Sequence, residues 1–197
     1  MPAVTVVRSL FRYALLFLMS VVTTASAAAP EIDVKVEKRD DTFFIDSTFE
    51  VPVTQRTAWQ VLVDFDNMTN ILHNLTSSRI VSRSGNTLQV KQEGIARFGV
   101  FSYTFTSERE IRLEPRKRIL VRQISGNTKH YASEMEIIPG DNGTRFRYHA
   151  EMALDSTLGK LFGRPFIEHE IAEQFTAMAA EMERRQTPQQ SVAPENL

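Results

Sequence analysis

Residues 165–185 read PFIEHEIAEQFTAMAAEMERR, and this stretch has the pattern of one long amphipathic helix. Pro165 suits the first turn of a helix, where the missing N–H group of proline has no intrahelical partner to lose. Large apolar residues then recur at intervals of 4, 4, 3 and 4, which places them on one helical face: Ile167, Ile171, Phe175, Met178 and Met182. The spacing predicts a helix of about 20 residues, roughly 30 Å long, with one face to bury.

Upstream of this helix, apolar and polar residues alternate in a series of short runs that predict β-strands. The turns between the runs are built from Gly, Asn, Asp and Pro, and no proline falls inside a predicted strand. Successive strands joined by such short turns form an antiparallel sheet. The predicted strands are 42–51, 79–83, 87–92, 100–112, 118–124, 131–138 and 144–154.

Two short helical segments are expected between the first two strands. Thr54 is a suitable N-cap for a helix over Gln55–Val63, and residues 64–75 follow as a second short helix or helical loop. A single sheet with one apolar face needs a cover, and the C-terminal helix is long enough to supply it. The predicted fold class is therefore α+β: a curved antiparallel sheet of about seven strands wrapped around a long C-terminal helix.

The two ends of the chain differ from this pattern. Two arginines, an apolar run over residues 13–22 and the small residues Ala25-Ser26-Ala27 have the order of a secretory signal peptide. An uncleaved membrane anchor is the alternative, although this run is shorter than the roughly 20 residues that span a bilayer. We expect residues 1–27 to be a cleaved leader for a periplasmic or secreted protein, and residues 186–197 to be a disordered tail. One domain, residues 31–185, lies between them.

The composition excludes several classes of function. The 197 residues carry 23 Lys and Arg against 24 Asp and Glu, and this net charge of −1 argues against nucleic-acid binding. Without cysteine there is no thiol catalysis, no disulfide and no cysteine-ligated metal. The four histidines have no metal-ligand spacing, and no nucleophile-elbow, phosphate-loop or dinucleotide glycine motif occurs. We therefore assign no catalytic residue and expect neither a metal nor a cofactor.

Three segments carry a resemblance to a known family: VPVTQRTAWQVLVDFD at 51–66, FSYTF at 101–105, and the helix at 166–182. From residue 49 to 185 the chain resembles the helix-grip superfamily of START, Bet v 1 and polyketide-cyclase-like proteins, and within it the coenzyme Q-binding START subgroup. The resemblance implies a hydrophobic cavity between sheet and helix that holds a lipid, a quinone or a polycyclic molecule. It does not distinguish a carrier from an enzyme, because the superfamily contains both.

Large apolar side chains are expected to line this cavity. Tyr103 and Tyr148 fall in phase with the inward residues of their strands, where each hydroxyl needs a partner and either is able to orient a ligand carbonyl. A tightly packed core without a cavity is the alternative for the whole set. The predicted lining consists of Leu72, Phe101, Tyr103, Phe105, Leu120, Met135, Phe146, Tyr148, Met152, Phe166, Phe175 and Met178.

Three polar residues are candidates for contact with a ligand. Arg109 is in phase with Phe105 and Arg122 with Leu120, so each directs a charge toward the end of the cavity unless its strand end releases it to water. His73 is expected at the cavity lip, where acid–base work is open to it. A separate basic turn predicts either a solvated hairpin tip or a contact with anionic lipid at a membrane surface: Arg112, Arg116, Lys117 and Arg118.

These observations favour an exported, non-enzymatic protein that carries a hydrophobic small molecule. A cyclase or aromatase on the same fold is the first alternative, with Tyr103, Tyr148 or His73 as acid–base groups. The second alternative is an interaction protein in which the space between helix and sheet is filled.

Overall fold

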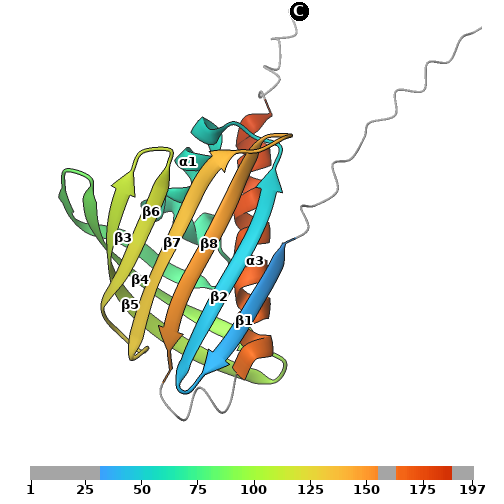
Figure 1. Ribbon diagram of the computed structural model, residues 1–197. Coiled ribbons are helices and arrows are strands. Elements are labelled where there is room, and N and C mark those ends of the chain that lie inside the picture. Colours follow the sequence, from blue (N-terminus) through green and yellow to red (C-terminus); the bar gives the residue numbers. More distant parts are fainter. Residues whose placement is uncertain (1–31, 155–162, 188–197) are drawn as a thin grey trace, which may run out of the picture.

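The computed structural model describes residues 32–154 and 163–187 of the chain (Figure 1). The expected leader, residues 1–27, and residues 188–197 of the expected tail lie outside the described residues. Gln186, the first residue of the expected tail, lies in the C-terminal helix.

One antiparallel sheet of eight strands forms the body of the domain. Neighbouring strands follow the order β1-β2-β8-β7-β6-β5-β4-β3. Hairpins therefore link successive strands from β3 to β8, and β8 pairs with β2. The strands are β1 Asp33–Arg39, β2 Thr42–Val51, β3 Leu75–Ser84, β4 Thr87–Phe98, β5 Phe101–Glu114, β6 Arg118–Gly126, β7 His130–Pro139 and β8 Thr144–Ala153.

The N-terminal edge strand β1 is the element that the sequence pattern did not predict. Its sequence, DVKVEKR, alternates short valines with charges, and only Val36 is fully buried among its residues. Charged residues are typical of an edge strand because they oppose pairing with a second sheet. The other seven strands and the α+β fold class are confirmed.

Two short helices connect β2 to β3, as expected. The helix α1, Gln55–Leu62, begins at Thr54, whose side-chain oxygen accepts a hydrogen bond from the Thr57 N–H at 3.2 Å. A single 3-10 helix, η1 Phe65–Asn70, follows, and β3 then begins at Leu75. The predicted helical segment is thus shorter than 64–75, and its last residues lead into the sheet.

The C-terminal helix α3, Gly163–Gln186, runs along one face of the sheet, behind it in the view of Figure 1. Ile167, Phe175 and Met182 of the predicted apolar stripe are buried, while Ile171 and Met178 are half-buried against the core. The buried face of α3 also includes Ala179 and one charged residue, Glu170.

Aromatic rings join α3 to the centre of the sheet. The Phe175 ring stacks on Phe49 of β2 at a centroid distance of 4.9 Å, and Phe49 stacks on Phe146 of β8 at the same distance. Tyr148 meets Phe175 edge-on at 5.0 Å. These contacts fill the middle of the interface, so any cavity between helix and sheet lies toward one end of α3.

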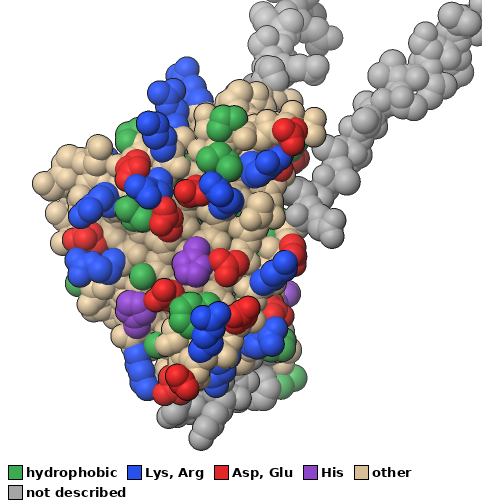
Figure 2. Space-filling view, in the orientation of Figure 1, with side chains coloured by type: hydrophobic (Ala, Val, Ile, Leu, Met, Phe, Trp, Pro, Cys, Tyr) green, Lys and Arg blue, Asp and Glu red, His purple; other side chains and the backbone are tan. Residues whose placement is uncertain are grey.

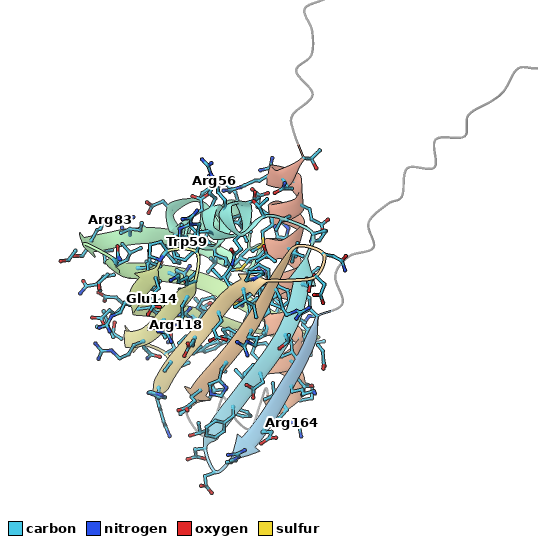
Figure 3. The ribbon with its side chains drawn as sticks, turned by 45° about the horizontal axis from the view of Figure 1, so that its top comes forward. Arg56, Trp59, Arg83, Glu114, Arg118 and Arg164 are labelled. Atoms are coloured by element: carbon cyan, nitrogen blue, oxygen red, sulfur yellow. The ribbon has the colours of Figure 1, made fainter. Side chains whose placement is uncertain are left out.

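The last turn of α3 is fixed to α1. The guanidinium of Arg185 donates to Asp64 at 2.7 Å, and the Thr57 hydroxyl donates to Gln186 at 2.7 Å. Figure 3 shows Arg56 and Trp59 of α1 at this end and Arg164, at the start of α3, at the opposite end of the molecule. Within the described ranges, no helix is both long and apolar enough to cross a membrane.

Candidate ligand-binding site

A cavity of about 170 Å³ lies between the first half of α3 and the sheet. Its walls come from α3, from strands β4, β5, β7 and β8, and from the connections before β3 and between β6 and β7. Asn127 and Thr106, on the rim, are exposed to solvent. The lining residues are Asn74, Ala96, Tyr103, Phe105, Thr106, Ser107, Arg109, Asn127, Thr128, Tyr131, Met152, Leu154, Phe166, Ile167, Glu170, Ile171 and Gln174.

Arg109 is the cation of this cavity. The odd-numbered residues of β5 face inward, so Arg109 follows Tyr103, Phe105 and Ser107 along the cavity wall. Its guanidinium carbon lies 4.6 Å from the centroid of the Tyr131 ring, which is a cation–π geometry. In the described part of the chain, the buried Nε of Arg109 and the buried hydroxyl of Ser107 have no hydrogen-bond partner.

A hydrogen-bonded pair of tyrosines supports the ring below Arg109. The hydroxyls of Tyr131 and Tyr148 lie 2.8 Å apart, and the Tyr131 hydroxyl also donates to Ser133 at 3.2 Å. Tyr148 belongs to the core, and its burial raises its pKa well above the ordinary value. The phenol therefore stays neutral and holds Tyr131 in place by hydrogen bonding.

Glu170 is the acidic residue of the cavity, and it faces inward from α3. The residue is only 9% exposed, and its Oε2 accepts a hydrogen bond from the side-chain amide of Asn74 at 3.1 Å. Burial raises the pKa of the Glu170 carboxyl, and the Asn74 hydrogen bond opposes this shift only in part. A carboxyl in this position is stabilised in its neutral form relative to one in water.

A glycine lets the Asn74 segment and β5 approach β4. The Asn74 carbonyl accepts from the Ile95 N–H at 2.8 Å, and a Cβ at Gly94 would lie 2.2 Å from that carbonyl oxygen. The same Cβ would lie 2.6 Å from the Phe105 ring. Gly94 therefore allows both the Asn74 loop and the Phe105 wall to come close to the sheet.

Only some of the predicted site residues lie at the cavity. Five of them line the cavity: Tyr103, Phe105, Arg109, Met152 and Phe166. Six others belong to the packed core or lie against it, away from the cavity lining: Leu72, Met135, Phe146, Tyr148, Phe175 and Met178. His73 is exposed and does not line the cavity, although the next residue, Asn74, does. The side chain of Phe101 lies outside the described part.

Leu120 and Arg122 lie on the outer face of the sheet, not toward the cavity as expected. Ile119 pairs with Met135, and both are buried, so it is the odd-numbered residues of β6 that face inward there. The run Ile119-Leu120-Val121 is apolar throughout and so has no period from which the inward face is readable. The guanidinium of Arg122 instead donates to Glu110 at 3.2 Å on the outer face.

Several polar lining residues were not predicted: Asn74, Asn127, Tyr131, Glu170 and Gln174. Glu170 did have a signal, because it lies three residues after Ile167 and one before Ile171, inside the apolar stripe of the helix. A charged residue at such a position is either paired or placed at a site. Tyr131 lies near the start of β7, where apolar and polar residues alternate only weakly. No comparable pattern in the sequence therefore indicates that its side chain faces inward.

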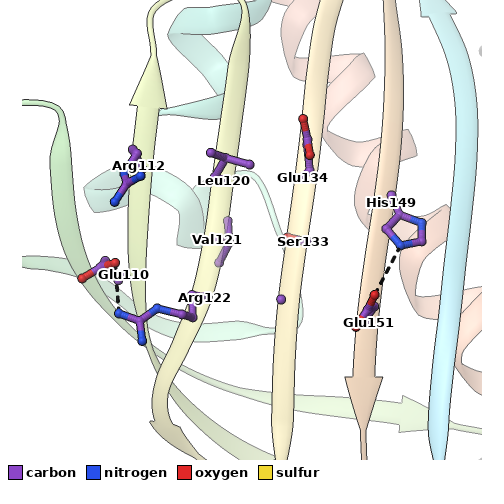
Figure 4. Close-up of a pocket in the computed structure, with 10 residues that line it drawn as sticks. Glu110, Arg112, Leu120, Val121, Arg122, Ser133, Glu134, His149 and Glu151 are labelled. Carbon is purple, nitrogen blue, oxygen red and sulfur yellow. Dashed lines mark hydrogen bonds and ion pairs between the residues drawn. The ribbon is translucent and has the colours of Figure 1, made fainter.

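A second hollow, of about 400 Å³, lies on the outer face over β5, β6, β7 and β8 (Figure 4). Two of its acidic residues pair with arginines: Glu110 with Arg122, and Glu134 with Arg118. Figure 2 shows acidic and basic side chains interspersed over this face. A hollow of paired charges suits water better than an apolar ligand, so we take the smaller cavity beneath α3 as the candidate site.

The basic turn between β5 and β6 is separate from the cavity. It lies beside Gln55 of α1 and the end of β7, and Arg118 within it donates to Glu114 at 2.7 Å and to Glu134 at 3.0 Å. These two carboxylates raise the pKa of the Arg118 guanidinium above its already high value. Figure 3 labels this pair, Glu114 and Arg118. In the described part of the chain, no three His, Asp or Glu side chains are grouped closely enough to hold a metal.

Comparisons with known proteins agree with this architecture. A family model described as polyketide cyclase / dehydrase and lipid transport matches residues 43–185, whereas a search of curated protein sequences found no match. The chain is similar to the Zhui aromatase/cyclase from Streptomyces sp. R1128, with a TM-score of 0.66 and 16% identity over 75% of this chain and 97% of that one.

Two further solved structures carry lipid-transfer or START descriptions. The STAR-related lipid transfer protein from Xanthomonas axonopodis has a TM-score of 0.57 and 10% identity, covering 80% of this chain and 95% of its own. A START superfamily protein from Mycobacterium smegmatis has a TM-score of 0.57 and 13% identity, covering 73% of this chain and 96% of its own. At such low identity, these similarities establish the shared fold alone.

Proposed function

Since the chain belongs to the family of polyketide cyclases, dehydrases and lipid-transport proteins, we propose that it is a carrier for a hydrophobic small molecule held beneath α3. One observation supports this proposal most strongly. The cavity has walls of apolar and aromatic side chains, and the guanidinium of Arg109 faces into it with a buried Nε that has no partner among the described residues. Such a site suits a ligand with an apolar body and one oxygen-rich end.

The energetics of the guanidinium point to the polar end of the ligand. Arg109 is half-buried, and its buried Nε has no partner among the described residues, so a carboxylate, phenolate or carbonyl oxygen bound there would supply the missing acceptor. Contact with the Tyr131 ring restrains the guanidinium, so less side-chain entropy is lost when it binds an acceptor. Arg109 therefore anchors the head of the ligand, and the apolar walls take its body.

The size of the cavity limits what it encloses completely. About 170 Å³ is close to the volume of a cavity that accepts a single aromatic ring. A longer chain or a fused ring system extends toward the solvent-exposed rim at Thr106 and Asn127, or requires the first half of α3 to move away from the sheet.

The side chains that line the cavity favour a carrier role. None of the four histidines, all of which are described, lines it, and the phenols of Tyr131 and Tyr148 hydrogen-bond to each other. Export follows from the pattern of residues 1–27 and is part of the same proposal. Cell fractionation tests it: the carrier account expects a protein shortened by about 27 residues in the periplasm or medium.

The position of Glu170 supports an enzyme as the second candidate function. A carboxyl whose pKa is raised by burial, inside a cavity, is a suitable general acid or base for a cyclase or aromatase reaction. A purified protein that converts a polyketide-like substrate, with conversion lost in Glu170→Gln, would replace the carrier by this second candidate.

Native mass spectrometry of the protein purified from its own host tests the carrier proposal. We expect a bound molecule that organic extraction removes and that is absent or much reduced in Arg109→Met. The matched control is Arg122→Met, which removes an arginine on the outer face and should keep the ligand. An empty protein that takes up no fatty acid or quinone analogue at micromolar concentration would contradict the proposal.

A further inference from the structure

The cavity contains two side chains of opposite charge that do not neutralise each other. Arg109 enters from β5 and Glu170 from α3, and both line the same space. In the described part of the chain neither takes part in any ion pair within 4.0 Å, whereas ion pairs are frequent on the outer face of the sheet. Arg97 of β4, whose backbone lies near Glu170, pairs with Ser102 of β5, whereas Arg109 lies seven residues further along that strand. The acidic and the cationic side chains therefore enter the cavity at different levels of the sheet, which gives it an acidic end and a positive end.

The acidic end is held by rigid donors. Asn74, which donates to Glu170, is itself fixed because its backbone carbonyl accepts from Ile95 of β4. The nearby backbone N–H of Arg97 also favours the ionised Glu170 carboxyl and so opposes part of the rise in its pKa. The carboxyl thus keeps one orientation relative to the sheet, and its position does not depend on a flexible neighbour.

The chemistry of this end favours a ligand hydroxyl. A hydroxyl both donates and accepts, so it pairs with the Glu170 carboxyl in either protonation state, whereas a second carboxylate is repelled by the ionised form. Apolar side chains contribute to the walls of the same cavity, whose volume of about 170 Å³ is close to that needed for one aromatic ring: Phe105, Tyr131, Met152 and Ile171. A ring with a hydroxyl at one end and an acidic group at the other matches all three regions.

We propose that the site selects ligands with two polar groups on one apolar body: an acidic or carbonyl oxygen bound by Arg109, and a hydroxyl bound by Glu170 and Asn74. Hydroxylated aromatic acids are the smallest members of this class. The inference rests on the proposed function, because it assumes that the cavity beneath α3 is the binding site, and it adds the second point of recognition.

Three small probes separate the two contacts when their binding to the protein, purified from its complete coding sequence, is measured by calorimetry. Para-hydroxyphenylpropionate carries both groups, phenylpropionate lacks the hydroxyl, and para-propylphenol lacks the acid. We expect the first to bind at least about tenfold more tightly than either of the others, because each loses one buried hydrogen bond to a charged or acidic group. Decanoate, which has an acid but neither a ring nor a hydroxyl, tests the Arg109 contact and the apolar walls without the second contact.

Variants assign each contact to its residue. Glu170→Met should remove the advantage over phenylpropionate and leave the binding of phenylpropionate itself within about twofold, while Glu170→Gln, which still donates and accepts, should keep most of the advantage. Arg109→Met should remove the advantage over para-propylphenol. Circular dichroism spectra matching the unaltered protein show that the variants fold.

Failure of the second contact and failure of the carrier proposal would give different binding results. If phenylpropionate binds as tightly as its hydroxylated relative, or if Glu170→Met leaves the preference intact, the second point of recognition is overturned and the carrier proposal stands. If none of the aromatic probes binds and decanoate also fails to bind, both proposals are overturned.

Discussion

The guanidinium of Arg109 lies over the ring of Tyr131, with its carbon atom 4.6 Å from the ring centroid, inside a cavity that α3 closes against the sheet. The ring is held from below by the 2.8 Å contact between the hydroxyls of Tyr131 and Tyr148. The Arg109 guanidinium lies against this ring, and no acidic side chain among the described residues pairs with it. It is therefore positioned to bind an acceptor. This relationship is the basis of the ligand-binding account.

Removing the hydroxyl of Tyr131 tests whether this support matters. In Tyr131→Phe the ring remains under Arg109, but the hydrogen bonds to Tyr148 and Ser133 are lost. We expect the affinity for an acidic apolar probe such as decanoate to fall by less than about tenfold, against a larger loss in Tyr131→Ala, which also removes the ring. Equal losses in the two variants, measured by calorimetry, would contradict a role for the ring itself.

Glu170 should make the stability of the empty protein fall as the pH rises. Burial raises its pKa, so above the ordinary value of 4.5 the unfolded chain releases this proton before the folded protein does. Folding is then progressively less favourable as the pH rises through the folded pKa. Glu170→Gln removes this effect, so its melting temperature at neutral pH should exceed that of the unaltered protein by about 2–4 °C, for about 1 kcal/mol.

The pH dependence distinguishes this cause from a general change in packing. Below pH 4.5 the carboxyl is protonated in both states, and the difference between the two proteins should disappear. A Glu170→Gln protein that is less stable than the unaltered one at every pH would show that the ionised carboxylate is favourable where it lies.

Glu181 has the opposite dependence. The Arg184 guanidinium donates to it at 2.6 Å and Arg185 adds a second bond, and together they lower the pKa of the Glu181 carboxyl to about 2. Its contribution to stability is therefore present above the ordinary value of 4.5 and is lost as the pH falls toward 2. Glu181→Gln should cost about 1–2 kcal/mol at neutral pH.

Denaturant titrations at several pH values measure this contribution. The cost of Glu181→Gln should shrink steadily from neutral pH to the acid limit, because protonation removes the same charge from the unaltered protein. Glu173→Gln is the control, since Glu173 lies on an exposed part of the same helix and should cost much less. A cost that does not vary with pH would mean that the charge of Glu181 is not what stabilises the end of α3.

Phe175 is the point at which a charge should destroy the fold. Its ring contacts Phe49 and Tyr148 at centroid distances of 4.9 Å and 5.0 Å, inside the hydrophobic core. Phe175→Asp should cost more than about 4 kcal/mol and leave the domain unfolded or melting far below the unaltered protein. Ala180→Asp, on the exposed side of α3, is the control. A melting temperature within about 2 °C of the unaltered protein would contradict the assigned buried face.

The fold was largely predictable because its elements have clear periods. The intervals of the apolar residues in 165–185 indicate a helix with one buried face, and the alternation in 42–51 and 144–154 indicates strands with one buried face. Both inferences depend only on local spacing. The edge strand β1 was missed since its inward residues are small and most of the others are charged.

The site was less predictable because it depends on which face of the sheet each side chain points to, and residue type alone does not indicate this. The run from Ile119 to Val121 does not reveal which side chain faces inward, so Leu120 and Arg122 were expected on the wrong face. The partnership of Glu170 with Asn74 joins residues 96 positions apart, and no local pattern predicts it. A rule that treats a charge inside an apolar stripe as a site candidate would have found Glu170.

The most direct test of the account is to map where an apolar acid binds, by following the amide chemical shifts of the protein during a titration with decanoate. The account predicts the largest changes around Arg109, Tyr131 and Glu170, and their loss in Arg109→Met. Changes confined to the outer-face hollow around Glu134 and His149, or no changes at all, would contradict it.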